Sequence, residues 1–224
     1  MPRETFFNLP ADKRDRLVEV ALDELSRCSF DAASVSRMVA AADIAKGSFY
    51  QYFDDKMDLF GWLVEEAGRR RAAWFADLPV PDGADPFSRL RFAYREGLGF
   101  WRAEPRWSRV ASRLWEPSED PRMAAMRTRT EGLIHAFLVG LLRDGQASGA
   151  VRADLDVEPA AWLVSGMLQE GLLRAFFASL GSTMERWPED AHTVTDAQLT
   201  EAMRGAALAV DLLEAAVGTP SRAA

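Results

Sequence analysis

Side chains that commonly act as nucleophiles or metal ligands are few and scattered in this sequence. There is one cysteine, Cys28, and there are two histidines, His135 and His192. A lone cysteine cannot form a disulfide within the chain, and neither histidine has a partner at metal-ligand spacing. No Ser-His-Asp or Cys-His arrangement can be assembled. The sequence therefore predicts no catalytic residues, no metal and no cofactor.

A different chemistry, hydrogen bonding to nucleic acid, is indicated by residues 34–56, which read SVSRMVAAADIAKGSFYQYFDDK. Ser34 can cap a short helix over about 35–41, and a turn at 42–44 precedes a second short helix over about 45–50 or 45–53. Two such helices form a helix-turn-helix, whose second helix can enter the major groove of DNA. The spacing turns one set of residues toward a core, namely Ile44, Phe49 and Phe53. It turns another set outward, namely Lys46, Gly47, Ser48, Tyr50 and Gln51.

The overall charge does not support DNA binding by itself. The net charge is −7, and the first 80 residues hold 11 Lys and Arg against 14 Asp and Glu. DNA binding must therefore depend on local placement of charge. Arg37 and Lys56 flank the second helix, where phosphate contacts would lie. The alternative is that the two short helices simply pack on a third one.

The elements that would position this motif are helical throughout. Apolar residues recur every three or four positions over 10–27 and again over 56–78. Residues 79–86 have the composition of a linker, and helical patterns follow over 87–103, 106–115, 121–148, 157–180 and 195–216. We therefore expect an all-α fold. A three-helix helix-turn-helix head would occupy residues 1–60, a connecting helix 56–78, and a helical body 80–224.

The composition is that of a folded globular chain of 224 residues. Apolar residues make up 48% and charged residues 27%, which excludes disorder. The longest uncharged runs, 132–142 and 159–169, are shorter than the ~20 residues that cross a bilayer. The first residues lack the apolar core of a signal peptide. We expect a cytoplasmic protein with no membrane partner.

The run IAKGSFYQYFDDKMDLF, residues 44–60, resembles the N-terminal signature of TetR-family transcriptional regulators. In that signature Val or Ile and a small residue precede Lys-Gly-Ser/Thr, an aromatic, Tyr-x-Tyr/His-Phe and a later Lys. The preceding ASVSRMVAAA resembles the family's first helix of the helix-turn-helix, and TFFNLPADKRDRLVEVALDELSR resembles its leading helix. The resemblance covers about residues 6–64. Beyond them only the all-helical, dimeric architecture of the family's C-terminal domain agrees.

The resemblance implies ten DNA-binding residues. Three lie where members of the family contact base edges or the groove: Lys46, Gly47 and Ser48. Three lie where members contact the groove or phosphates: Tyr50, Gln51 and Tyr52. Three lie where the preceding helix meets the DNA backbone: Ser34, Ser36 and Arg37. Lys56 lies where a lysine approaches a phosphate. Such backbone contacts fix register, whereas Lys46 and Gln51 could read guanine and adenine.

Two positions depart from the family pattern. Asp43 stands where the turn usually has glycine, and aspartate tolerates the left-handed conformation better than most residues. It could alternatively cap the second helix. Ala45 replaces the usual Ser or Thr cap. An acidic turn close to DNA is expected to weaken binding.

The body supplies material for a ligand pocket as well as for a core. Five of the seven tryptophans lie beyond the linker, and large apolar walls suit a small-molecule site. Both readings of these aromatic residues stay open. The residues expected to line a pocket are Phe100, Trp101, Trp107, Trp115, Met126, Phe137, Gln169 and Arg174. The expected ligand is a small, largely apolar effector of unknown identity, bound between the linker and the dimer helices.

The helices expected over 157–180 and 195–216 indicate a homodimer. Apolar residues cover nearly the whole circumference of the first and a broad stripe of the second, so each needs a second surface to bury them. Two such helices from each subunit would form a four-helix bundle. The interface residues expected are Trp162, Gly166, Leu173, Phe177, Met203, Ala206 and Val210.

These observations predict a DNA-binding transcriptional regulator and not an enzyme. The most specific hypothesis is a homodimeric repressor that a small effector releases from a palindromic operator on double-stranded DNA. One alternative is an all-α small-molecule-binding protein or enzyme whose N-terminal helices only mimic the motif. Another is a protein-binding adaptor that keeps the head but does not bind DNA.

Overall fold

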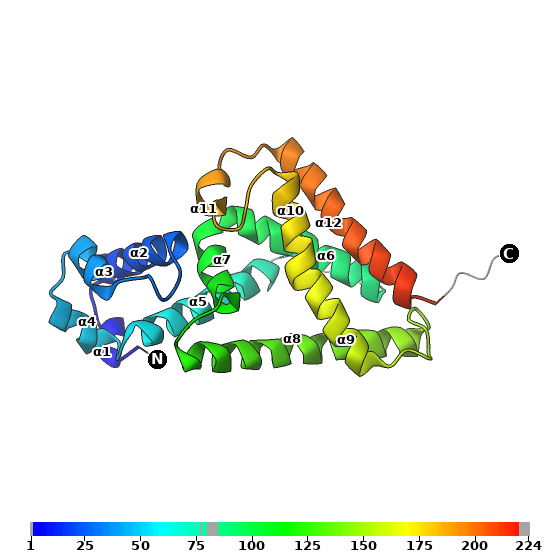
Figure 1. Cartoon of the computed structure of the whole chain (residues 1–224), viewed down its shortest axis with the longest axis horizontal. Coiled ribbons are helices and arrows are strands. Elements are labelled where there is room, and N and C mark those ends of the chain that lie inside the picture. Colours follow the sequence, from blue (N-terminus) through cyan, green and yellow to red (C-terminus); the bar gives the residue numbers. More distant parts are fainter. Residues whose placement is uncertain (1, 77, 80–84, 220–224) are drawn as a thin grey trace. The chain divides into compact units, whose positions relative to one another are not determined.

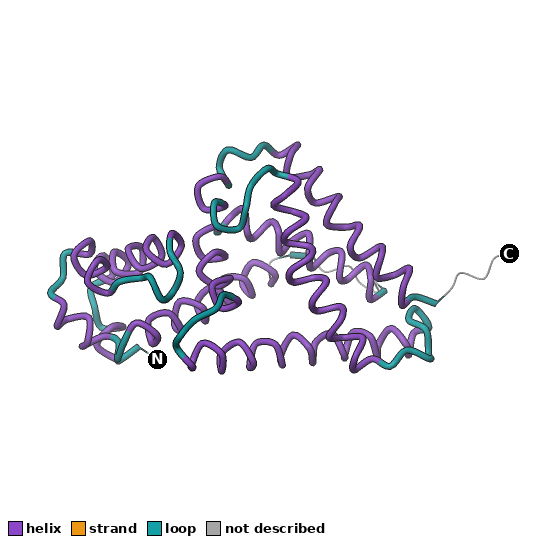
Figure 2. The backbone as a smooth tube through the Cα atoms, in the orientation of Figure 1, coloured by secondary structure: helices purple, strands orange, loops and turns teal. Residues whose placement is uncertain are grey.

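The computed structural model describes residues 2–76, 78–79 and 85–219, and within these residues it contains helices and no strand (Figures 1 and 2). The all-α expectation is confirmed. The chain divides into two compact units. Unit 1 comprises residues 1–76 and 104–127, and unit 2 comprises residues 77–103 and 128–224. Most of the linker expected at 79–86 lies outside the described residues.

Unit 1 begins with a single helical turn, α1 (Glu4–Phe7), followed by α2 (Ala11–Arg27), α3 (Val35–Ala42), α4 (Lys46–Tyr52) and α5 (Lys56–Ala76). It also contains α7 (Pro105–Ser112), the short 3-10 helix η1 (Arg113–Trp115) and the first turns of α8 (Pro121–Ser148). The helices from α2 to α5 begin within a residue of the positions that the sequence predicts. The sequence does not predict α1, because four residues are too few to show a helical period.

The core of unit 1 explains why residues 104–127 belong with the head and not with the body. Phe6, Leu22 and Phe49 are completely buried, and Trp107 and Val110 of α7 pack in the same cluster. The head expected at residues 1–60 is therefore incomplete, since its core is closed by a segment some fifty residues further along the chain. Hydrophobic periodicity reports which face of α7 is buried but not against which helix it is buried.

Unit 2 comprises α6 (Pro86–Ala103), the rest of α8, α9 (Val157–Gly166), α10 (Leu172–Ser179), the short α11 (Trp187–Asp190) and α12 (Asp196–Val217). The helix expected over 157–180 is interrupted by a π-helical turn, η2 (Met167–Gly171). Helix α12 runs along α6 and α10 (Figure 1). The core contains an aromatic cluster in which the indole N–H of Trp187 donates to the carbonyl of Trp101 at 2.8 Å.

No helix in the described part of the chain is long and apolar enough to span a bilayer.

Candidate nucleic-acid interface

Helices α3 and α4 form a helix-turn-helix whose turn depends on Asp43. Ser34 is the N-cap of α3, and its hydroxyl accepts the backbone N–H of Arg37 at 3.4 Å. Asp43 ends α3 in the left-handed conformation, with φ 57° and ψ 46°. It is the one non-glycine residue with positive φ in the described part of the chain. Aspartate therefore takes the glycine role, as expected. The idea that it caps α4 is wrong, because the N-cap of α4 is Ala45, which makes no side-chain cap.

The orientation of α4 matches the outward and inward sets predicted from its spacing. Phe49 and Phe53 are completely buried and Ile44 is half-buried. The outward set is Lys46, Gly47, Tyr50 and Gln51, which are exposed, together with Ser48, which is half-buried. A Cβ placed on Gly47 would meet no atom within 4 Å, so the helix surface is open there. Tyr52 is half-buried, and Ser36 is exposed on α3. Helix α4 thus presents a small, polar, cationic face to its surroundings.

Lys56 does not project as a phosphate contact would. Its ammonium group donates to the carbonyl oxygens of Phe30, Asp31 and Ala33 at 2.6, 3.1 and 2.9 Å. It also lies 4.5 Å from the ring centroid of Phe30. An ammonium has three donors, and these three carbonyls use all of them. The expectation of a phosphate contact is therefore corrected: Lys56 holds the loop between α2 and α3 in place.

Arg37 is engaged in the same loop. Its guanidinium forms an ion pair with Glu24 and donates to the carbonyl of Ala32 at 2.8 Å. The Glu24 carboxylate also accepts the backbone N–H of Ser34 at 2.8 Å. The Arg37 side chain is still 59% exposed, so its role as a flanking phosphate clamp stays a prediction. Arg37 also braces the start of α3. Spacing alone cannot show this, because Glu24 lies thirteen residues away on another helix.

The ion pair between Glu24 and Arg37 predicts a pH-dependent stability. Burial alone would raise the pKa of Glu24, but the hydrogen bonds from Arg37 and Ser34 and the Arg37 charge lower it overall, below 4.5. A carboxylate with a lowered pKa stabilises the fold at neutral pH, and the contribution is lost as pH falls from 4.5 through the folded-state pKa. Glu24→Gln should lower the free energy of unfolding by about 1–3 kcal/mol at neutral pH.

Urea unfolding at several pH values measures this difference. The gap between wild type and Glu24→Gln should narrow as the pH drops below 4.5. Glu65→Gln, an exposed substitution on α5, serves as the matched control and should change stability little. A gap that stays constant down to acid pH would contradict the assignment.

Helix α4 is also held from the N-terminal side, by contacts that the sequence did not reveal. The backbone N–H of Arg3 donates to the carbonyl of Tyr52 at 2.8 Å, and the Thr5 hydroxyl donates to the carbonyl of Gln51. Arg3 also pairs with Asp54 at 2.6 Å. These bonds occupy carbonyls at the C-terminal end of α4. No short-range pattern signals them, because the partners are about fifty residues apart.

The segment that follows α7 braces the opposite end of the motif. The Arg113 guanidinium donates to the carbonyls of Leu25 and Ser26, both at 2.9 Å, at the end of α2. Asp31 accepts the Ser118 hydroxyl at 2.8 Å. The loop that positions Ser34 is thus held by Glu24, Lys56 and residues beyond 112. No sequence motif marks Arg113 or Asp31, because their partners are more than eighty residues away along the chain.

The residues expected to line a ligand pocket are divided between the two units. Trp107, Trp115 and Met126 belong to unit 1, whereas the others belong to unit 2. Trp107 is 5% exposed in the head core, and the Arg70 guanidinium lies 4.4 Å from its ring centroid. Trp101 is packed edge-on against Phe177 within the core of unit 2. The remaining members of the set are the buried Phe100, the exposed Phe137 and Arg174, and the half-buried Gln169. A pocket lined by these residues therefore stays a prediction.

The expected dimer residues divide into two groups. Trp162 and Gly166 are exposed, and Leu173 and Met203 are half-buried. Phe177 and Val210 are 3% and 0% exposed in the core of their own chain, so they cannot contact a partner, and this part of the expectation is corrected. Both belong to helices that are apolar on more than one face, where periodicity does not say which face turns inward. The side chain of Ala206 lies outside the described residues. Three further leucines of α9 and α12 are exposed: Leu163, Leu208 and Leu212.

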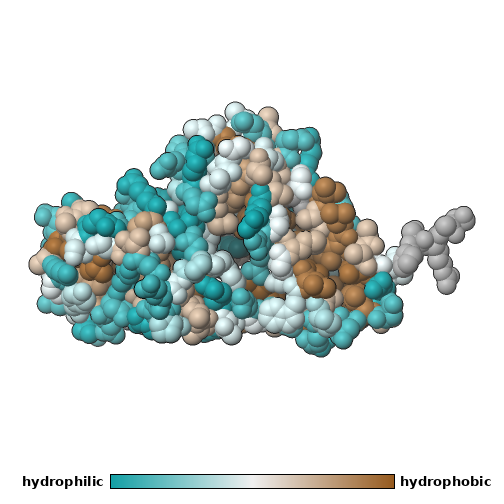
Figure 3. All heavy atoms as spheres, in the orientation of Figure 1, coloured by the Kyte–Doolittle hydropathy of each residue, from teal (hydrophilic) through white to brown (hydrophobic). Residues whose placement is uncertain are grey.

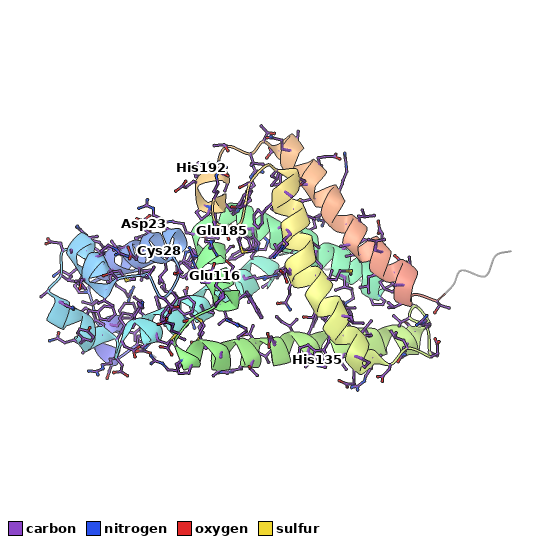
Figure 4. The ribbon with its side chains drawn as sticks, viewed as in Figure 1. Asp23, Cys28, Glu116, His135, Glu185 and His192 are labelled. Carbon is purple, nitrogen blue, oxygen red and sulfur yellow. The ribbon has the colours of Figure 1, made fainter. Side chains whose placement is uncertain are left out.

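The lone cysteine and the histidine of α8 are both engaged in contacts within the fold (Figure 4). The Cys28 thiol donates to the carbonyl of Glu24 at 3.2 Å, and its burial raises its pKa, which disfavours the reactive thiolate. His135 lies on α8 and stacks on Trp162 at 4.2 Å, far from His192, which follows α11. No group of three His, Cys, Asp or Glu side chains that could hold a metal occurs among the described residues.

Comparisons with known proteins agree with this geometry. Residues 17–61 match the model of bacterial regulatory proteins of the tetR family. The chain is 30% identical over 155 residues to the transcriptional regulator AcuR of Cereibacter sphaeroides, covering 65% of this chain and 68% of that protein. It is 31% identical over 83 residues, 36% of each chain, to the HTH-type transcriptional repressor KstR of Mycobacterium tuberculosis.

A solved structure extends the similarity to the whole length. The crystal structure of a TetR family transcriptional regulator from Chloroflexus aurantiacus is 30% identical, with a TM-score of 0.75. The match covers 98% of this chain and 100% of that one. The similarity therefore includes the helical body as well as the helix-turn-helix.

Proposed function

The chain belongs to the TetR family of transcriptional regulators, and from that premise we propose that it is a cytoplasmic, homodimeric repressor which a small, largely apolar effector releases from a palindromic operator. Its relatives are transcriptional regulators and not enzymes, which removes the enzyme alternative. One of these relatives, KstR, is a transcriptional repressor, which supports repression over activation.

The single observation that carries DNA binding is the exposed face of α4. Lys46 is exposed in the first turn, and among the described interactions its ammonium has no partner. Gly47 beside it leaves room for close approach, and Tyr50 is 44% exposed. A cationic, small and hydrogen-bonding face on the second helix is what entry into a major groove requires. The braced loop before α3 keeps this helix in place.

Exposed apolar side chains on α9 and α12 support the homodimer. Leu163 is 77% exposed on α9, and Leu208 and Leu212 are 57% and 59% exposed on α12. The spacing of Leu208 and Leu212 places them on one face of α12. Figure 3 shows hydrophobic surface gathered over α12. Contiguous apolar surface of this kind marks a protein interface in a soluble protein. A twofold dimer would read half-sites spaced by roughly 34–36 Å or a multiple.

The π-helical turn in unit 2 supports an effector site there. π-Turns inside α-helices are rare and occur frequently at functional sites. This turn carries Gln169, whose side-chain amide donates to the buried Ser165 hydroxyl at 2.5 Å. The turn also joins α9 to α10, so it lies in the helical run expected to form the dimer. An effector that shifts the register of this turn would change how the subunits meet.

The direct test is to sequence the genomic fragments that the full-length protein retains, and then to titrate one fragment at increasing salt. Proteins held by phosphate contacts lose affinity steeply as salt rises. We expect a sequence with twofold symmetry and a steep salt dependence. Retention of no preferred sequence would favour the protein-binding adaptor instead.

The acidic turn offers a gain-of-affinity prediction. Asp43→Asn removes one negative charge from the turn before α4, and asparagine keeps the left-handed conformation. Because phosphate repulsion falls, affinity for DNA should rise by roughly twofold to fivefold at low salt, with the gain shrinking as salt increases. Fluorescence anisotropy with labelled duplex measures both trends. Asp12→Asn, the same charge change on α2, is the matched control; an equal gain in that variant would show a general charge effect.

A further inference from the structure

A pocket in unit 1 lies between α1, α2, α5 and α7. Its volume is about 250 Å³, and its walls include Phe6, Phe7, Trp62 and Trp107. Pockets for drug-sized ligands measure about 300–1,000 Å³, so this one suits a smaller molecule. All its lining residues belong to unit 1, which separates the pocket from any effector site in unit 2.

The aromatic walls are fixed, but one of them is open to solvent. Phe6 is completely buried and packs edge-on against Trp62, with ring centroids 5.0 Å apart. Phe7 packs edge-on against Phe6 and yet is 50% exposed. A phenyl ring that is half open beside a pocket gains by being covered with apolar or aromatic surface. The walls therefore favour an occupant with a flat ring.

The charged residues that line the pocket are two arginines and two carboxylates, and they differ in how fully they are paired. Glu66 is already neutralised by Arg69 and Arg70, and Arg70 is also paired with Glu104 at 3.3 Å. Arg14 has only distant partners: the Phe7 carbonyl at 3.4 Å and Asp15 at 4.0 Å. The Arg14 side chain is 35% exposed, whereas that of Asp15 is 72% exposed. Arg14 is thus the more weakly paired of the two arginines at the rim, and a guanidinium fork matches a carboxylate.

A second pocket of unit 1 is lined by polar groups that are already paired. It measures about 350 Å³ and is lined by Lys56, Asp31 and Arg122 among others. Lys56 is held by three carbonyls, and Asp31 by the Ser118 hydroxyl and the Glu119 N–H. Arg122 pairs with both Asp55 and Asp120. These polar groups satisfy one another.

We propose that the pocket between α1, α2, α5 and α7 binds a small aromatic monocarboxylate. The ring lies against Phe7 and Trp62, and the carboxylate accepts hydrogen bonds from Arg14. Binding here does not depend on the proposed function, because none of these residues belongs to the exposed face of α4.

The test is a ligand-observed NMR titration of the full-length protein with benzoate. Wild type should bind benzoate saturably, and benzyl alcohol, which keeps the ring without the charge, should bind at least several-fold more weakly. Arg14→Gln should weaken benzoate binding by roughly tenfold, because a charge-assisted pair is lost. Phe7→Ala removes an exposed ring and should also weaken binding.

Lys13→Gln is the matched control, since it removes the same charge from the neighbouring position of α2 without lining the pocket. It should bind benzoate as wild type does. Circular dichroism and thermal unfolding establish that each variant is folded. Saturable binding that Arg14→Gln and Phe7→Ala leave unchanged would place benzoate elsewhere in the chain and overturn the proposal. So would the absence of saturable binding below about 10 mM.

Discussion

Lys46→Ala is expected to cost about 1–3 kcal/mol of operator-binding free energy per subunit, and to relax the choice of one base in each half-site. Lys46 is exposed at the start of α4 and makes no ion pair in the described part of the chain, so its removal leaves the fold intact. The loss should be largest on the correct site and small on unrelated duplex, because a base contact adds specificity to phosphate attraction. Anisotropy titrations on both duplexes measure the difference.

Lys13→Ala provides the control, because it removes the same charge from α2 in the same unit. It should affect both duplexes alike and only slightly. Equal losses for Lys46→Ala on the operator and on unrelated DNA would make Lys46 a phosphate contact. No loss on either duplex would remove α4 from the interface.

Leu208→Glu combined with Leu212→Glu is expected to convert the proposed homodimer to a monomer of 24.9 kDa and to abolish high-affinity operator binding. Both leucines are more than half exposed on one face of α12, so the change should cost little stability in the monomer. In a dimer, four carboxylates would be buried against apolar surface, which is strongly unfavourable. Sedimentation at micromolar concentration measures the mass.

Phe7→Glu is the control that tests whether replacing any exposed apolar residue by a charged one dissociates the dimer. Phe7 is 50% exposed but belongs to unit 1, and its replacement should leave the dimer intact. A double variant that still sediments as a dimer would move the interface away from α12. In that case Leu163→Glu on α9 becomes the informative variant, since it tests the other half of the expected bundle.

The sequence predicts the elements well wherever the signal is local. The helix expected at 121–148 matches α8 at both ends, and Ser34 caps α3 as its position suggests. The turn after α3 requires a left-handed residue, and Asp43 adopts that conformation in place of the usual glycine. These features depend on residues within one or two helical turns of each other, which is the range over which periodicity and capping act.

The sequence does not predict the contacts of a side chain whose partner is distant along the chain. Lys56 and Arg37 have the charge and position of phosphate contacts, yet carbonyls of residues 30–33 and the carboxylate of Glu24 engage them. Phe177 lies in a helical run that is apolar around nearly its whole circumference, and Val210 lies on the broad apolar stripe of α12. Only tertiary packing decides which part of each apolar surface is inside. A cation on a surface helix therefore needs its full list of neighbours before it is assigned to DNA.

The discontinuity of unit 1 has a consequence for hybrid regulators. The chain leaves this unit after residue 76 and returns for residues 104–127, which include Trp107, Val110 and Arg113. A graft of residues 1–76 onto a foreign body would lack the side chains that close the core and the guanidinium that caps the end of α2. Transplanting both stretches together keeps these contacts. The exchangeable module is thus two pieces of sequence that share one core.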